Sequence, residues 1–218
     1  MSEPGAAESP PFRWYSRTDD AEGESEEKTA ARLPRAERER LRSLTPARAH
    51  RFLRGRALLF ESIARWGEGV DAAGFSLHAH CPHCGGPHGA PTIDGAPLVA
   101  SLSHGRGISV AVLADSRVVA AVGIDTEPDT SSLERRAAIA TLTGVAPAYA
   151  LRHWTRIEAV LKADGRGLRV DPESVRMSAP RHPLADASAM IAGNAHVYDV
   201  FDVAALPGYL TSVATRPR

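Results

Sequence analysis

Two acidic residues two positions apart, Asp125 and Glu127, directly follow a short apolar run at 118–124. In an extended chain this spacing places both carboxylates on the same face, where they repel each other unless a cation lies between them. Oxygen ligands from acidic side chains suit a hard divalent cation, and Mg²⁺ is favoured where water completes the coordination shell. A polar strand end that runs into a turn is the plainer interpretation, and the spacing alone favours it.

A third acidic residue, Glu158, lies in a segment at 154–162 that has helical periodicity. Trp154, Ile157 and Leu161 repeat at i, i+3 and i+7 and form an apolar stripe. Glu158 and Lys162, at i and i+4, share a neighbouring face of the same helix. The ordinary interpretation of this pair is an exposed ion pair, which contributes little to stability.

Three segments are more specific together than apart: G-I-D-T-E at 123–127, W-T-x-x-E-A-x-x-K at 154–162 and G-R-G-L at 165–168. They resemble the signature of the stand-alone, surfactin-type 4′-phosphopantetheinyl transferases, which reads G-[IV]-D-x-E followed by W-[ST]-x-K-E-[AS]-x-x-K. The resemblance implies a Mg²⁺-dependent enzyme that transfers 4′-phosphopantetheine from coenzyme A to a serine of an apo acyl or peptidyl carrier protein. The other product would be 3′,5′-ADP.

The resemblance also implies roles for individual residues. The expected metal ligands are Asp125, Glu127 and Glu158. The expected catalytic residues are Glu158, Lys162 and His104. Coenzyme A is expected to contact Arg48, Arg51, Ser103, His104 and Lys162. Of these, Arg51 ends an A-H-R triplet that resembles the start of a family helix, and Ser103-His104-Gly105 resembles the family's S-H-S loop.

Three positions depart from the family pattern. Ala90 replaces the lysine of a G-K-P loop, Gly105 replaces the second serine of S-H-S, and Ile157 replaces the lysine before the glutamate. These losses keep open a second hypothesis, a non-catalytic module that binds coenzyme A or a carrier protein. Retention of all three acids argues against it, because a binding module does not need a metal site.

A C-x-x-C pair at Cys81 and Cys84, with either His83 or His88 as a further ligand, supports a third hypothesis, a zinc-binding interaction protein. Structural zinc sites usually have four ligands, often as two separated pairs. Here the candidate ligands are crowded into one short segment and the sequence has no second C-x-x-C pair. We therefore expect that these cysteines hold no zinc and that the segment is a loop rich in glycine and proline.

The elements that must position these residues follow from periodicity. Helices are predicted at about 47–66, with arginines crowded at its start, at 131–145 and at 154–163. Strands are predicted at 98–102, 108–113, 118–124, 198–203 and 209–214. This order indicates an α+β fold. The family resemblance adds the expectation of two similar halves, each a small sheet with a long helix, related by pseudo-twofold symmetry.

The chain has 218 residues, zero formal net charge and 43% hydrophobic residues. A neutral chain without a long apolar run predicts a cytoplasmic protein, expected to be monomeric, that binds neither nucleic acid nor membrane. The segment 1–32 is acidic and is predicted to be a disordered tail, although Phe12, Trp14 and Tyr15 would be able to dock locally. The two halves are expected at 33–121, with the coenzyme A contacts, and at 122–218, with the acids.

Overall fold

The computed structural model describes residues 9–20, 23–67, 70, 74–81 and 84–218. The first part of the chain contains β1 (Arg13–Thr18), α1 (Glu26–Arg32), α2 (Arg35–Arg42), α3 (Pro46–Trp66), β2 (Ser76–Ala79), β3 (Pro91–Asp94), β4 (Leu98–Gly105) and β5 (Ile108–Asp115). The second part contains β6 (Val119–Pro128), α4 (Leu133–Thr143), α5 (Pro147–Asp164), β7 (Val175–Ser178), β8 (Ala187–Ile191), β9 (Val197–Val203) and β10 (Tyr209–Pro217). Two short 3₁₀ turns, Gly167–Arg169 and Pro172–Ser174, connect α5 to β7. The protein is α+β, as the periodicity predicted.

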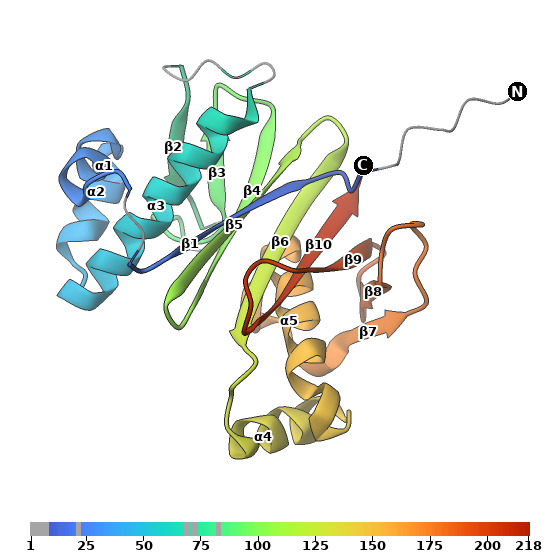
Figure 1. Ribbon diagram of the computed structural model, residues 1–218. Helices are drawn as coiled ribbons and strands as arrows, with labels where there is room; N and C mark the ends of the chain where they lie inside the picture. The colour runs from blue at the N-terminus through green and yellow to red at the C-terminus, as the bar shows by residue number, and fades with distance from the viewer. Residues whose placement is uncertain (1–8, 21–22, 68–69, 71–73, 82–83) are drawn as a thin grey trace, which may run out of the picture.

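The described strands form three antiparallel sheets. Their strand orders are β1-β5-β4, β6-β10-β9-β8-β7 and the hairpin β2-β3. Helix α3 packs on the first sheet and helix α5 packs on the second (Figure 1). Strands β4 and β6 lie side by side without a shared ladder, and the Ile124 amide donates to Ser101 Oγ across this junction at 3.2 Å.

The long helix α3 begins and ends where its sequence predicts. Thr45 is an extended N-cap and Pro46 occupies the first turn, where the missing N–H costs nothing. Its inward face carries Leu59 and Ile63, which are fully buried against the first sheet, and Phe52 and Trp66, which are half-buried against the same core. Gly67 has φ of 82°, a conformation that favours glycine, and it ends the helix.

The predicted disorder of segment 1–32 is wrong for its described residues. Strand β1 pairs with β5 along its whole length, and α1 covers Glu26–Arg32. Phe12 is buried and packs edge-to-face on Phe201, with ring centroids 5.1 Å apart. The acidic composition of the segment predicted disorder, but the residues around Trp14 favour a β-strand. They form one because they pair with the edge of β5, a partner that exists only in the folded protein. Residues 1–8 and 21–22 of the segment lie outside the described residues.

Two further boundaries differ from the sequence predictions. Ser103, His104 and Gly105 lie inside β4 rather than in a loop, so they belong to a sheet edge that faces β6. The expected division after residue 121 falls inside β6, which also carries Asp125 and Glu127 within the strand. The directions of the Ser103, His104, Asp125 and Glu127 side chains are therefore set by the alternation of two strands and not by a loop conformation. In the described part of the chain no helix is both long enough and apolar enough to cross a membrane.

Candidate functional site

Two adjacent cavities lie between the first sheet, helix α3 and helix α5. The first, here called the carboxylate pocket, is lined by Arg51, Leu102, Ser103, His104, Asp125, Glu127, Arg135, Trp154, Glu158 and Lys162. The second, here called the arginine pocket, is lined by Arg40, Phe52, Arg56, Gly89, Ala90, Pro91, Ser101, Leu102, His104, Leu161, Lys162, Gly165 and Gly167. Volumes of about 380 and 300 Å³ suit a small organic ligand. Leu102, His104 and Lys162 line both cavities, so one ligand is able to extend through the two.

Lys162 joins three of the elements that line the carboxylate pocket, α5, β6 and β4. Its Nζ donates to Asp125 Oδ1 at 2.7 Å, to the Ile124 carbonyl oxygen at 2.9 Å and to Ser103 Oγ at 2.9 Å. Ser103 Oγ donates in turn to Asp125 Oδ1 at 2.9 Å. These bonds tie α5 to β6 and to β4, and they compensate the nearly buried charge of Asp125.

Glu158 is the acid that has no such compensation. It lies one turn before Lys162 on the same face of α5, and within the described residues its carboxylate makes no hydrogen bond or ion pair. Burial raises the pKa of Glu158 and the charges of Asp125 and Glu127 raise it further, against a lowering effect of Lys162. Glu158 is therefore the carboxylate in this pocket that is best suited to accept a proton near neutral pH.

Glu127 lies two residues after Asp125 on β6 and lines the same pocket. Its carboxylate forms an ion pair with Arg135, which α4 supplies. In the described part of the chain the oxygen atoms of Asp125, Glu127 and Glu158 are not all within 4.8 Å of one another. The acids share one cavity, and two of the three contact a cationic side chain. Carboxylate oxygens are the type of donor that a hard divalent cation such as Mg²⁺ prefers, but these three carboxylates would have to move closer together to coordinate one ion directly.

His104 stands at the passage between the two cavities. Its Nδ1 lies 2.9 Å from Ser109 Oγ on β5. Burial lowers the pKa of His104 to about 4, and the positive charges of Arg51 and Lys162 contribute to the shift. The ring is therefore neutral at pH 7. When Ser109 donates to Nδ1, Nε2 carries the hydrogen and is available as a donor to a ligand.

The depressed pKa of His104 predicts a pH-dependent stability. The unfolded chain takes up this proton near pH 6.5, whereas the folded protein resists it until about pH 4. The contribution of the neutral His104 ring to the free energy of unfolding is thus fully present above pH 6.5, and it is lost as the pH falls toward 4. Between pH 7 and pH 4.5 we expect wild type to lose about 2 kcal/mol more unfolding free energy than His104→Gln. Urea denaturation at both pH values measures this, and equal losses would contradict it.

The arginine pocket has an excess of positive charge around one aromatic ring. The guanidinium carbons of Arg40 and Arg56 lie 5.1 and 4.8 Å from the centroid of Phe52. Arg56 is buried and forms a bidentate pair with the fully buried Glu37, with Nε at 2.6 Å from Oε2. Burial lowers the pKa of Arg40, and the charge of Arg56 lowers it further. Two cations with one carboxylate at the edge of a cavity favour an anionic ligand.

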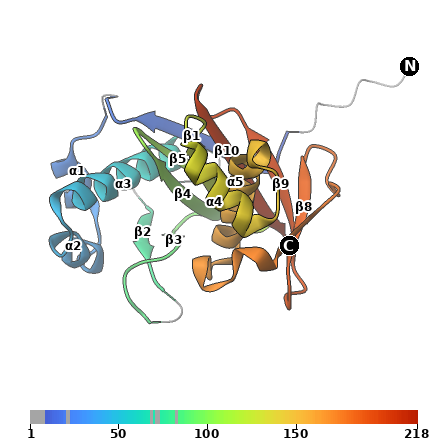
Figure 2. The same ribbon diagram turned by 90° about the horizontal axis from the view of Figure 1, so that it is seen from below.

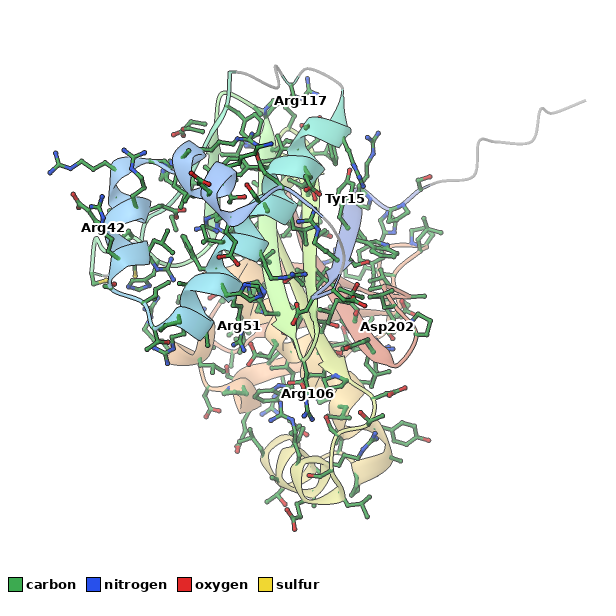
Figure 3. All side chains as sticks on the ribbon, turned by 60° about the vertical axis from the view of Figure 1, so that its left-hand side comes forward. Tyr15, Arg42, Arg51, Arg106, Arg117 and Asp202 are labelled. Atoms are coloured by element: carbon green, nitrogen blue, oxygen red, sulfur yellow. The ribbon has the colours of Figure 1, made fainter. Side chains whose placement is uncertain are left out.

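Most of the site residues expected from the sequence meet in one place. Arg51, Ser103, His104, Asp125, Glu127, Glu158 and Lys162 all line the carboxylate pocket. Arg48 is exposed on α3 and lines neither cavity. Figure 3 shows Arg51 on α3, well separated from Arg42 at the edge of the molecule.

Several residues of the site were not assigned to it from the sequence. Arg135 and Arg40 line the cavities, but nothing in the sequence distinguished them from other arginines. Arg56, which lines the arginine pocket, belongs to the arginines crowded at the start of the helix predicted at 47–66, a basic cluster that is a candidate anion site. Trp154 was expected in the apolar stripe, and it does pack, half-buried, against the core cluster of Ile139, Ala150 and Leu151, but it also lines the carboxylate pocket. Long-range contacts select these residues, so periodicity alone had no signal for them.

The packing explains two of the three departures from the family pattern. Ile157 is 1% exposed and belongs to the core beneath α5, where a lysine ammonium would be buried without a partner. A Cβ at Gly105 would lie 2.9 Å from Ile108 Cγ2, which leaves little room for a serine. Ala90 lines the arginine pocket, where Arg40 and Arg56 supply positive charge.

Comparison of the chain with protein-family models gives no match. Comparison with curated proteins gives none either.

Proposed function

We propose that this protein is a 4′-phosphopantetheinyl transferase that modifies a serine of an acyl or peptidyl carrier protein. The observation that carries the proposal is that Asp125, Glu127, Glu158 and Lys162 line one cavity. These residues come from two motifs that are distant in the sequence, since Asp125 and Glu158 are 33 positions apart (158 − 125). The adjoining arginine pocket adds a place for a second anionic group. Coenzyme A, with a pyrophosphate and a 3′-phosphate, has this distribution of charge.

The architecture is compatible with the proposal. Each part of the chain has an antiparallel sheet with one long helix packed on it, α3 on β1-β5-β4 and α5 on β6-β10-β9-β8-β7 (Figure 1). Two similar halves of this kind are what the family resemblance implies. The carboxylate pocket lies where β4 of the first sheet meets β6 and α5 of the second.

In the proposed complex Asp125, Glu127 and Glu158 would hold Mg²⁺, which would neutralise charge on the pyrophosphate. Arg51 would contact phosphate oxygens, and Lys162 would do so by exchanging one of its three hydrogen bonds. His104 would donate one hydrogen bond as a neutral ring. This arrangement would surround with cations a group that gains negative charge as the phosphoanhydride bond breaks.

Glu158 has the clearest chemical role in the proposal. Its raised pKa and lack of a fixed partner suit a general base that accepts the proton of the carrier serine. The serine oxygen then forms the new bond to the β-phosphorus, and 3′,5′-ADP leaves with the electrons of the broken P–O bond. Lys162, held on Asp125, remains next to the reacting group throughout.

The decisive experiment incubates the full chain with coenzyme A, Mg²⁺ and a panel of apo carrier proteins, and measures intact mass. We expect the mass of one phosphopantetheine group to be added to at least one carrier, and no addition in EDTA. If no carrier of a broad panel is modified while coenzyme A still binds, the protein is a binding module and not a transferase.

In the proposed complex, Arg40 in the arginine pocket would bind the 3′-phosphate of coenzyme A. Each charge-assisted hydrogen bond to a phosphate contributes about 1.5–3 kcal/mol, so Arg40→Ala should weaken coenzyme A binding about 10- to 100-fold. Binding of 3′-dephospho-coenzyme A should change less than about threefold, because it lacks the phosphate assigned to this pocket. Calorimetric titration of both ligands measures the difference.

Arg42→Ala is the matched control for this prediction. Arg42 lies two residues further along α2, is exposed and lines neither cavity (Figure 3). We expect it to bind both ligands as wild type does. An equal loss of both ligands in Arg40→Ala would show that Arg40 supports the fold of the pocket and does not contact the 3′-phosphate. The hydrogen bond that Arg40 donates to the Pro87 carbonyl oxygen at 2.8 Å would be the reason.

A further inference from the structure

The segment between β2 and β3 brings three metal-binding side chains together outside the two cavities. The ligand atoms of Cys81, Cys84 and His88 all lie within 4.8 Å of one another, and Cys84 Sγ is 3.0 Å from His88 Nε2. Cys81 is buried, whereas Cys84 and His88 are exposed. The two cysteines form no disulfide. The sequence predicted that Cys81 and Cys84 hold no zinc, but the fold brings their sulfur atoms close to the His88 ring. The alternative ligand, His83, lies outside the described residues.

Backbone hydrogen bonds hold the described residues of this segment together around Cys81. The Gly85 amide donates to the Cys81 carbonyl oxygen and the Cys81 amide donates to the Gly86 carbonyl oxygen, both at 2.9 Å. Gly85 has φ of 67°, which a glycine adopts without strain. A Cβ at Gly86 would lie 3.3 Å from both Cys84 Sγ and His88 Cδ2, so the absence of a side chain there keeps space at the cluster.

We propose that Cys81, Cys84 and His88 bind one Zn²⁺ ion. Two thiolates and an imidazole are donors that zinc prefers over Mg²⁺ or Ca²⁺, and where the protein supplies three ligands a water molecule takes the fourth tetrahedral position. A donor set of soft sulfur and nitrogen is chemically distinct from the oxygen donors of the carboxylate pocket. The site therefore does not depend on the proposed transferase activity.

The zinc ion would fix the conformation of the connection between β2 and β3. Figure 2 shows this hairpin at the edge of the molecule, and β2 contacts α2. The connection is also attached to α2 through the bond from Arg40 to the Pro87 carbonyl oxygen. Its last residues, Gly89 and Ala90, line the arginine pocket, so a fixed turn would hold one wall of that cavity. Binding would release the two thiol protons and would strengthen as the pH rises.

The test uses the full chain, produced without a histidine tag and kept reduced. The protein is stripped with a chelator, and Zn²⁺ is titrated against a chromophoric competitor. We expect one equivalent with a dissociation constant below about 1 μM, and at least a tenfold weaker constant for Cys84→Ser and for His88→Asn. Because both side chains are exposed, both variants should fold, which thermal denaturation of the stripped proteins verifies.

The matched control is His78→Asn. His78 lies on β2 three positions before Cys81, and its Nδ1 is 3.2 Å from an oxygen of Asp94, away from the cluster. It should bind zinc within twofold of wild type. Co²⁺ in place of Zn²⁺ should give a thiolate-to-metal absorption band that loses about half its intensity in Cys84→Ser, because one of two thiolates is removed.

Zinc should also protect Cys84 from alkylation. Its exposed thiol should react with iodoacetamide at least tenfold more slowly in the presence of one equivalent of Zn²⁺, since a metal-bound thiolate is a poorer nucleophile. The proposal is overturned if the stripped chain binds no zinc below 10 μM. It is also overturned if Cys84→Ser and His88→Asn bind as wild type does, because the ion would then reside elsewhere.

Discussion

Glu158→Gln should lower the turnover of the proposed transfer about 10²- to 10⁴-fold, the usual effect of removing a general base. Glutamine keeps the shape of the side chain and one oxygen, but it removes the charge and the proton acceptor. Burial, and then the charges of Asp125 and Glu127, raise the pKa of the Glu158 carboxylate. The substitution removes this ionisable group. Turnover is measured by intact mass of a carrier protein over time.

Coenzyme A affinity should change less than about threefold in the same variant. Arg40, Arg51 and His104 line the cavities independently of Glu158 and would still contact the phosphates. Glu134→Gln is the control, since Glu134 is exposed on the first turn of α4 and lines neither cavity. Near wild-type turnover in Glu158→Gln would mean that this residue is neither the base nor an essential metal ligand.

Gly123→Ala should lower the free energy of unfolding by about 2–4 kcal/mol, which for a chain of this size is a fall of roughly 5–15 °C in melting temperature. A Cβ at Gly123 would lie 2.5 Å from the Ala163 amide nitrogen, and nearer still to the Ala159 carbonyl oxygen. Both atoms belong to the backbone of α5. The helix would have to move away from β6, and Lys162 would then be displaced from Asp125. Calorimetric melting measures the effect.

Gly55→Ala is the informative comparison. A Cβ there would also be too close to its neighbours, at 2.5 Å from Leu102 Cδ2 and 2.8 Å from His104 Cε1, but these are ends of side chains that are able to rotate. Alanine also favours a helix interior by roughly 0.5–1 kcal/mol over glycine. We expect Gly55→Ala to melt near wild type while binding coenzyme A more weakly, because His104 and Leu102 line both cavities. A Gly123→Ala protein that melts within 2 °C of wild type would contradict the close packing of α5 on β6.

The sequence by itself determined what depends on local periodicity. Strand alternation placed Asp125 and Glu127 on one face, and the helical repeat placed Glu158 beside Lys162. The bounds of α3 and α4 were also predictable, because caps, proline and glycine act within a few residues. The start of α5 was predicted wrongly: the helix was expected at 154–163, but it begins at Pro147. Gly123 was visible as part of a motif, but its packing against α5 was not.

Only the tertiary structure decided which of these faces meet. Lys162 reaches Ser103 across 59 positions, Arg40 and Arg56 flank Phe52, and Arg135 pairs with Glu127 from a helix whose hydrophobic pattern says nothing about its partner. Strand β1 forms because β5 offers it an edge, and Cys81, Cys84 and His88 converge because the β2–β3 hairpin folds the segment between them. Periodicity sets the direction of a side chain within its own element. The partner of that side chain depends on long-range packing, which no local pattern contains.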